Sequence, residues 1–345
     1  MWDAFCKVPG HVFENENGSV ACDGYHRYRE DIRLAAEMGL KAYRFGVSWA
    51  RVDPSGTGRW NEEGLAYYDK VVNACLEAGL TPYVTLYHWE LPQALEEKGG
   101  WQVRQTAECF ARYAAVVAAR FKGRVGHYFT LNEPQCSVYL GYATGEHAPG
   151  KRLAQAEQFW CMHHLLLAHG LAFRAIRAQD GAAQISLATT GRLCYPETQT
   201  PPDIQAARSA TFALFDNDWA FTHHLFLDPV VHGGYPRCEG TFLAPLVDAA
   251  PPQDMEVIHT GLDFLSLNIY NGHAVRRGKA GKEEYVPRYT GFPRTALKWP
   301  VTPEVMNWGV HYMYQRYNLR VFITENGLSC NDKVFLDGGV HDPDR

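Results

Sequence analysis

The sequence predicts an α/β fold in which parallel strands alternate with helices. Segments rich in β-branched and aromatic residues alternate with segments of helical character along most of the 345 residues. Several of the strand segments are nearly continuous apolar runs, as expected of strands that are buried on both faces. Both a doubly wound sheet and a (β/α)8 barrel satisfy these two observations.

The first half of the chain predicts three strands, over 41–49, 81–88 and 125–131. A helix that stops at Gly39 precedes the first of them. Asn61 has the character of an N-cap, so a helix is expected from there to about residue 78, where Gly79 ends it. A further helix is expected over 105–121, between the second and third strands.

The second half of the chain continues the alternation. We expect helices over 153–179, 204–226 and 303–317, and strands over 185–190, 264–270 and 320–324. Neither an internal repeat nor a linker divides this pattern. Residues 1–345 are therefore expected to form a single domain.

Composition excludes several classes of partner. Lysine and arginine number 33 against 38 aspartate and glutamate, a net charge of −5 with no basic block, so no nucleic-acid partner is expected. The longest apolar stretch, 113–119, is too short to span a bilayer, so no membrane partner is expected. The nine cysteines form no Cys-x-x-Cys pair, which predicts free thiols and a reducing compartment. With no signal-peptide pattern at its start, the protein is expected to be cytoplasmic.

Cofactor motifs are not evident either. Gly56-Thr57-Gly58 lies in a loop and lacks the third glycine of a dinucleotide-binding turn, which favours a barrel over a doubly wound sheet. His163, His164 and His169 are spaced so that they do not share one helical face. We therefore expect neither a cofactor nor a metal.

Polar and aromatic residues follow four of the predicted strands, at the point where each strand ends. These segments are 88–90 (HWE), 132–134 (NEP), 268–270 (NIY) and 325–327 (ENG). In a barrel such ends converge on the face that carries the active site. Four strand ends of this kind are hard to explain by solubility alone.

Three of the four ends carry a carboxylate, and two of these residues, Glu133 and Glu325, are candidates for the chemistry. Glycoside hydrolysis needs two carboxyl groups, one to protonate the departing oxygen and one to act as nucleophile or base. Each residue also has a purely local interpretation. Glu133 would be a turn residue held extended by Pro134, and Glu325 an exposed residue beside an Asn-Gly turn.

The chain resembles glycoside hydrolase family 1, the β-glucosidase family, at its two signature motifs: TLNEP at 130–134 and ITENG at 323–327. The resemblance extends over almost the whole chain, through 43–45 with 48–49, 87–89, 141–150 and 267–270. It implies a TIM-type (β/α)8 barrel that forms one catalytic domain. It also implies a retaining β-glucosidase that releases terminal β-D-glucosyl residues from small β-glucosides.

The resemblance also implies a role for each residue that follows a strand. Glu325 matches the catalytic nucleophile and Glu133 the acid/base. Arg44 and Tyr270 match residues that support the nucleophile. The residues that match sugar ligands are His88, Trp89, Asn132, Asn268, Tyr270 and Trp299, with Asn132 at the 2-hydroxyl and the two tryptophans as aromatic walls.

The family barrel has eight strands, whereas six are predicted here. The segment 2–6 resembles the stretch after the family's first strand, and 341–345 resembles the approach to its last helices and strand. We therefore expect a barrel truncated to about six βα units. Its open edges would favour self-association, low stability and weak or absent activity of this chain alone.

Several alternatives stay open. A 6-phospho-β-glycosidase is the nearest within the family. The resemblance places the phosphate-binding residues of that group in the strand-eight region that is missing here, so the usual distinction cannot be made from them; Trp299 resembles the non-phosphorylated type. Galactose or fucose in place of glucose is a second alternative. A non-catalytic barrel fragment is a third. A metal-dependent aldolase or isomerase is disfavoured for want of a ligand cluster.

Overall fold

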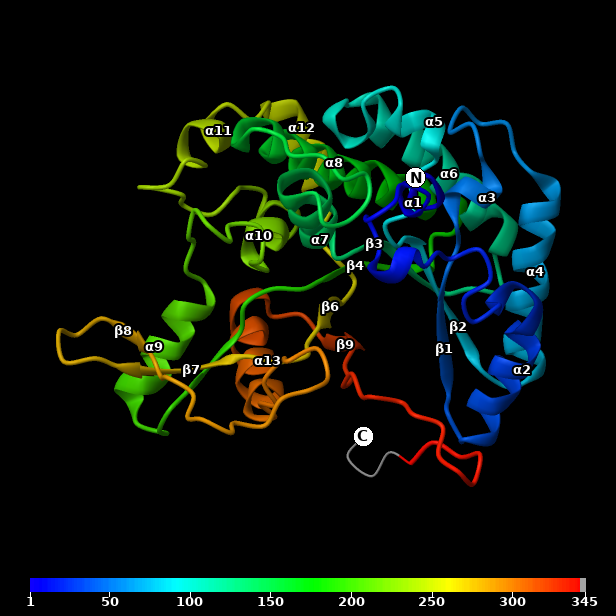
Figure 1. Ribbon diagram of the computed structural model, residues 1–345. Coiled ribbons are helices and arrows are strands. Elements are labelled where there is room, and N and C mark those ends of the chain that lie inside the picture. The colour runs from blue at the N-terminus through cyan, green and yellow to red at the C-terminus, as the bar shows by residue number, and fades with distance from the viewer. Residues whose placement is uncertain (342–345) are drawn as a thin grey trace. The chain divides into compact units, whose positions relative to one another are not determined.

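Four parallel strands organise the first of the two units into which the chain divides (Figure 1). The computed structural model describes residues 1–341; residues 342–345, the end of the expected closing segment, lie outside the described residues. Unit 1 comprises Met1–Thr189 and Leu225–Phe264. Unit 2 comprises Thr190–His224 and Leu265–Arg345. Each unit is described by itself.

The strands of unit 1 pair in chain order, each parallel to the next. They are β1 (Ala42–Gly46), β2 (Thr81–Tyr87), β3 (His127–Asn132) and β4 (Gln184–Thr189). Val84 lies opposite Phe45 on one side, and Tyr128 lies opposite Val84 and Ile185. Strands β2 to β4 are almost wholly buried, whereas β1 is only half-buried.

Helices connect these strands and cover them (Figure 1). The long ones are α2 (Gly24–Glu37), α4 (Glu62–Glu77), α6 (Gln105–Phe121) and α8 (Gln155–Gln179). The shorter ones are α1 (Trp2–Cys6), η1 (Phe13–Asn15), α3 (Trp49–Val52), α5 (Gln93–Glu96), η2 (Gly100–Gln102), α7 (Pro134–Val138), η3 (Tyr139–Thr144), α10 (His224–His232), α11 (Ala244–Asp248) and α12 (Pro252–Ile258). Asn61 caps α4 as expected, because its side chain accepts the Glu63 N–H at 3.2 Å.

Aromatic rings fill the space between the strands and the helices of unit 1. Trp49 stacks on Tyr113 with ring centroids 5.4 Å apart, and Phe110 lies against both. The indole N–H of Trp101 donates to the Tyr87 hydroxyl at 2.9 Å, which satisfies a polar group inside this core. All five rings are fully buried, so they fix α3 and α6 against the strands.

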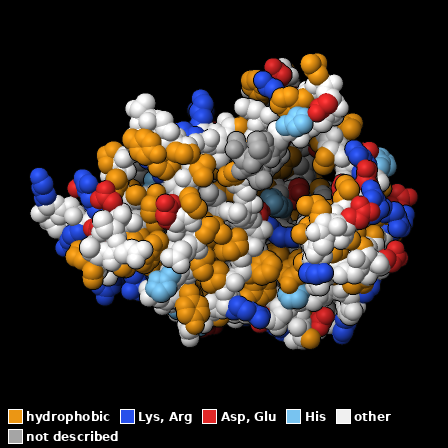
Figure 2. Space-filling view, turned by 90° about the horizontal axis from the view of Figure 1, so that it is seen from below, with side chains coloured by type: hydrophobic (Ala, Val, Ile, Leu, Met, Phe, Trp, Pro, Cys, Tyr) orange, Lys and Arg blue, Asp and Glu red, His pale blue; other side chains and the backbone are white. Residues whose placement is uncertain are grey.

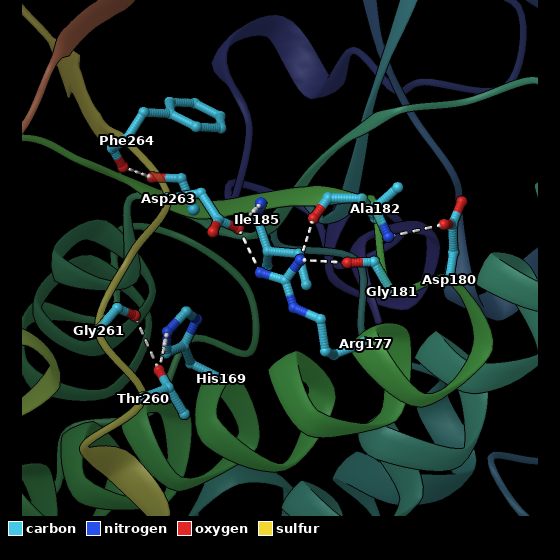
Figure 3. A network of polar contacts seen from close by, with 12 residues as sticks. His169, Arg177, Asp180, Gly181, Ala182, Ile185, Thr260, Gly261, Asp263 and Phe264 are labelled. Carbon is cyan, nitrogen blue, oxygen red and sulfur yellow. Dashed lines mark hydrogen bonds and ion pairs between the residues drawn. The ribbon is translucent and has the colours of Figure 1, made fainter.

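A polar network fastens α8 to strand β4 and to the chain that follows α12 (Figure 3). The Asp263 carboxylate accepts from the Arg177 guanidinium at 2.6 Å and from the Ile185 N–H at 2.7 Å. Arg177 also donates to the carbonyls of Gly181 and Ala183. One carboxylate thus ties a helix end, a strand start and a connecting segment together.

His169 makes a second link in the same region (Figure 3). One of its ring nitrogens lies 2.7 Å from the Thr130 hydroxyl of β3, and the other lies 3.3 Å from the Thr260 hydroxyl. Complete burial lowers the pKa of His169 to about 3, so the ring is neutral and can donate from one nitrogen while it accepts at the other. Strand β3 is thereby anchored at Thr130, two residues before its last residue.

Unit 2 holds a parallel pair of strands and a small mixed sheet. Strands β6 (Leu265–Asn268) and β9 (Val321–Glu325) pair in parallel. A separate sheet has the order β5 (Cys194–Pro196), β7 (His273–Arg277) and β8 (Glu283–Tyr285), in which β7 and β8 form an antiparallel hairpin. Helices α9 (Pro201–Thr211) and α13 (Glu304–Tyr317) complete the unit.

The six strands expected from the sequence are all present, and the prediction of an α/β class is confirmed. The helical prediction over 204–226 is wrong in its second half. Helix α9 ends at Thr211, and turns follow as far as α10. Residues 216–218 (DND) explain this, because aspartate and asparagine side chains compete for backbone groups and favour turns. The small sheet of β5, β7 and β8 was not predicted, since its strands are short and partly polar.

The outer faces of helices α2 and α4 carry acidic and basic side chains in mixture (Figure 2). Many of these form exposed pairs along or between helices, such as Arg33 with Glu37. Such pairs contribute little to stability and keep the face hydrophilic. Among the described residues, none of the helices has the length and the apolar character needed to cross a membrane.

We expect Asp263→Ala to destabilise the protein by about 2 kcal/mol, because the Arg177 guanidinium and the Ile185 N–H both lose a charged acceptor. Urea unfolding measures this change. The matched control is Glu37→Ala, which removes an exposed carboxylate from α2 and should cost less than about 0.5 kcal/mol. Equal effects of the two substitutions would contradict the role assigned to the network.

Candidate active site

Strand β3 ends in Asn132, and Glu133 begins helix α7 as its N-cap. The local interpretation of Glu133 as an extended residue is wrong: its backbone is left-handed, at φ 44° and ψ 62°. Pro134 disfavours a right-handed helical conformation at the residue before it, and a bond from the Glu133 N–H to the Ala188 carbonyl, 2.8 Å, holds the turn. Such backbone strain is typical of functional sites. The carboxyl is buried and accepts a weak bond from the Cys136 thiol at 3.3 Å.

Asn132 binds side chains from the two preceding strands, Arg44 from β1 and His88 and Trp89 from the turn after β2. Its amide oxygen accepts from the Arg44 guanidinium at 2.6 Å, and its amide nitrogen lies 3.1 Å from Nε2 of His88. Its backbone carbonyl accepts the indole N–H of Trp89 at 2.9 Å. Because the amide nitrogen can only donate, Nε2 of His88 is the acceptor in this pair. Arg44 also donates to the Thr85 hydroxyl at 3.0 Å, so its guanidinium links β1 to both β2 and β3.

The turn after strand β2 presents an aromatic face. Trp89 has a φ of 80°, and its ring lies 5.2 Å from that of His147. Trp2 lies on His147 in turn, with ring centroids 5.4 Å apart. Burial lowers the pKa of His147, which favours the neutral imidazole between two indoles. The three rings therefore form a continuous aromatic row, and Trp89 at one end of it is a residue predicted to bind the sugar.

Glu90 is a residue of this turn that the sequence analysis did not select. Its carboxylate accepts the backbone N–H of His88 at 3.3 Å. Desolvation by burial raises its pKa from 4.5 to about 7, against the smaller opposing effect of Arg51. The sequence indicated part of this role, because Glu90 directly follows His88 and Trp89 at a strand end. Its burial, however, depends on residues distant in sequence.

Unit 2 brings the remaining predicted residues together. Glu325 is the last residue of β9, and the Tyr270 hydroxyl donates to its carboxylate. The ring of Trp299 lies against that of Tyr270, with centroids 5.4 Å apart. Asn268 ends β6, and its amide oxygen accepts from the Thr324 hydroxyl at 2.6 Å. The local interpretation of Glu325 as a solvated turn residue does not account for these contacts, because its side chain is partly buried and bonded.

The nine predicted residues thus form two groups, one within each unit. The group in unit 1 contains Arg44, His88, Trp89, Asn132 and Glu133. The group in unit 2 contains Asn268, Tyr270, Trp299 and Glu325. Each group contains one carboxyl at the carboxyl end of a parallel strand, together with hydrogen-bonding and aromatic side chains from the same part of its unit. Such a pair of carboxyl groups has the chemistry for acid/base and nucleophilic roles.

Glu90→Gln is expected to stabilise the protein most at high pH. A carboxyl whose pKa is higher in the folded state binds its proton more tightly there, so stability is lost as the pH rises from 4.5 through 7. Glutamine mimics the neutral form. We expect the variant to gain about 2–3 kcal/mol at pH 8 and less than about 1 kcal/mol at pH 5, measured by urea unfolding at both pH values. A gain that does not change with pH would contradict the raised pKa.

Comparison with known proteins identifies the family. The model of glycosyl hydrolase family 1 matches residues 1–345. Beta-glucosidase A of Thermotoga maritima is 38% identical over 348 residues, which cover 100% of this chain and 76% of that protein. The beta-glucosidase of an Agrobacterium species is 37% identical over 351 residues, covering 100% and 74%. The aryl-phospho-beta-D-glucosidase BglC of Bacillus subtilis is 37% identical over 372 residues, covering 99% and 75%.

Solved structures agree with this assignment. The β-glucosidase from Thermotoga maritima in complex with noeuromycin has a TM-score of 0.86 at 38% identity, and the match covers 100% of this chain and 76% of that one. The same enzyme without a named ligand gives a TM-score of 0.85 over the same shares. The fold is therefore of the α/β TIM-barrel type that was predicted. The chain belongs to glycosyl hydrolase family 1 and is a glycoside hydrolase.

Proposed function

We propose that the protein is a retaining β-glucosidase that hydrolyses terminal β-D-glucosyl residues of small β-glucosides. The observation that carries the proposal is the pair of carboxyl groups at the ends of β3 and β9, of which Glu133 accepts from the Cys136 thiol and Glu325 from the Tyr270 hydroxyl. The names of the Thermotoga maritima and Agrobacterium relatives support glucose as the sugar.

In the first step, the Glu325 carboxylate attacks the anomeric carbon and forms an ester bond. The glycosidic C–O bond breaks, and Glu133 gives its proton to the departing oxygen. In the second step, Glu133 removes a proton from water, which attacks the same carbon and releases Glu325. This double displacement needs the two carboxyl groups about 5–5.5 Å apart. Tyr270 supports the step, because its hydroxyl donates to the Glu325 carboxylate.

The sugar is held, in this proposal, by the side chains around the two carboxyl groups. Asn132 contacts the 2-hydroxyl, a bond that strengthens as positive charge develops on the sugar ring in the transition state. Arg44 fixes the Asn132 amide oxygen, which leaves the orientation of the amide defined before substrate arrives. His88 and Asn268 bind further hydroxyls. Trp89 and Trp299 supply the aromatic walls.

A second candidate activity is hydrolysis of 6-phospho-β-glucosides. The observation in its favour is the 37% identity with the aryl-phospho-beta-D-glucosidase of Bacillus subtilis. Trp299 in the segment 298–300 (KWP) favours the unphosphorylated sugar instead. Parallel assays with 4-nitrophenyl β-glucoside and its 6-phosphate distinguish the two activities.

Three expectations about the whole chain accompany this proposal. We propose that residues 1–345 act as one catalytic domain. A reducing, cytoplasmic location is supported by the nine cysteines, all of which are free thiols. Self-association through exposed strand edges stays a prediction; the half-buried state of β1 is the observation that favours it.

The stereochemistry of hydrolysis tests the mechanism. We expect proton NMR to detect the β-anomer of glucose as the first product from 2,4-dinitrophenyl β-glucoside. First appearance of the α-anomer would contradict double displacement, and absence of turnover would favour a non-catalytic barrel.

Two variants separate the roles of the carboxyl groups. Glu325→Gln should lower kcat by about 10³-fold or more on every substrate, because the nucleophile is lost. Glu133→Gln should lower kcat/KM by about 10²–10⁴-fold on methyl β-glucoside, which needs a proton donor, and far less on the dinitrophenyl glucoside, which does not. Glu97→Gln, an exposed site, is the control and should retain full activity. The same loss on both substrates for Glu133→Gln would contradict its assignment as acid.

A further inference from the structure

The turn at the end of strand β2 has a strained backbone conformation, which requires stabilising contacts from its surroundings. Trp89 lies in the left-handed region, at φ 80°, which L side chains rarely adopt. Strained residues of this kind persist only where the surroundings fix them. On one side, the Trp89 indole N–H donates to the Asn132 carbonyl at 2.9 Å. On the other side lies the carboxylate of Glu90.

The Glu90 carboxylate spans the strained residue. It accepts the backbone N–H of His88 at 3.3 Å. His88 and Glu90 flank Trp89 in the chain, so this single bond closes the turn around the strained residue. A charged acceptor makes a stronger bond to an N–H than a neutral one does.

Among residues 1–341, the other side chains around Glu90 form no hydrogen bond to its carboxylate. Glu90 lines a cavity of about 570 Å³ together with Arg51. The Arg51 guanidinium donates to the Tyr68 hydroxyl at 3.2 Å and lies over the rings of Tyr25 and Tyr67. It therefore acts on Glu90 through its charge alone. The cavity gives the carboxyl a route for proton exchange with water.

We propose that Glu90 is a positioning residue for the sugar-binding side chains of His88 and Trp89, because its ionised carboxylate fixes the turn that presents them. This inference rests on the proposed function, in which those two side chains contact the sugar. Glu90 itself touches no reacting atom in this account. It acts through the backbone on either side of Trp89.

Protonation of Glu90 should then loosen the turn. Burial places the pKa of this carboxyl near 7, so the change falls in the neutral range. Other titratable groups face the same region, namely Arg51 from α3, Tyr68 from α4, Tyr87 from β2, Tyr113 from α6, the amino group of Met1, and His88 and His147 beside Trp89. The arginine stays cationic, and burial raises the pKa of each of these tyrosines. An experiment must distinguish the titration of the histidines and the amino group from the titration of Glu90.

The test follows the Trp89 indole N–H by ¹⁵N–¹H correlation NMR of the full chain with labelled tryptophan. The signal is identified by its loss in Trp89→Phe. We expect it to shift between about pH 5.5 and 8.5 with a midpoint near 7, and to stay constant in Glu90→Gln, which keeps an acceptor oxygen but does not titrate. Glu97→Ala, the matched control on an exposed carboxylate, should shift as the unmodified protein does.

Kinetics provide the second readout. Glu90→Ala removes the acceptor and should raise KM for 4-nitrophenyl β-glucoside about 10-fold while kcat changes less, because the loss is in sugar binding. Glu90→Gln, whose amide mimics the protonated carboxyl, should show at every pH the raised KM that the unmodified protein shows only below about pH 7. This conservative replacement distinguishes positioning from mere stability, because Glu90→Gln is expected to be more stable than the unmodified protein at pH 8, and it serves where Glu90→Ala does not fold.

The outcomes separate this inference from the proposed function. A Trp89 signal that shifts equally in Glu90→Gln assigns the effect to a histidine or to the Met1 amino group and overturns the inference. A signal that does not move in the unmodified protein overturns it as well. If the unmodified protein hydrolyses no glucoside, the proposed function fails, yet the NMR comparison still decides whether Glu90 holds the turn.

Discussion

The side-chain amide of Asn132 is the interaction on which the arrangement in unit 1 depends. An amide has one acceptor and one donor group, and here the oxygen binds Arg44 while the nitrogen binds His88. Aspartate in this position would offer no donor to His88, and leucine would remove the amide acceptor from the half-buried guanidinium of Arg44. Because Arg44 lies in β1, His88 directly follows β2 and Asn132 ends β3, a single side chain links three neighbouring strands.

The strand ends are held at some cost to the stability of the fold. Trp89 and Glu133 both adopt left-handed backbone conformations, and Glu90 keeps an ionisable group in a half-buried place. Each of these features lowers stability, and each lies within one or two residues of a predicted sugar or proton contact. Local strain and buried charge collected in this way are characteristic of sites selected for chemistry rather than for stability. The fully buried aromatic core around Trp49 offsets this cost.

Much of the fold could be predicted from periodicity and capping residues. Helix α6 begins and ends at the expected residues, and Asn61 caps α4 as its side chain suggested. The turn over 212–223 could not be separated from the neighbouring helices by hydrophobicity alone, although residues 216–218 carried the signal. The sheet of β5, β7 and β8 depends on pairing between residues about eighty positions apart, which local patterns do not encode.

The candidate residues could be named from their position after strands and from the family motifs, but their geometry could not. The left-handed backbone of Glu133 depends on a bond to Ala188, and the raised pKa of Glu90 depends on burial by helices far away in sequence.

The central claim is that Glu325 forms a covalent bond with the sugar. Intact mass spectrometry after incubation with 2,4-dinitrophenyl 2-deoxy-2-fluoro-β-glucoside tests it most directly, because such a compound forms the glycosyl-enzyme and hydrolyses slowly. The account predicts one fluoroglucosyl adduct per chain, mapped by peptide analysis to Glu325 and absent in Glu325→Gln. An adduct on a different residue, or none on a chain shown to be folded, would contradict it.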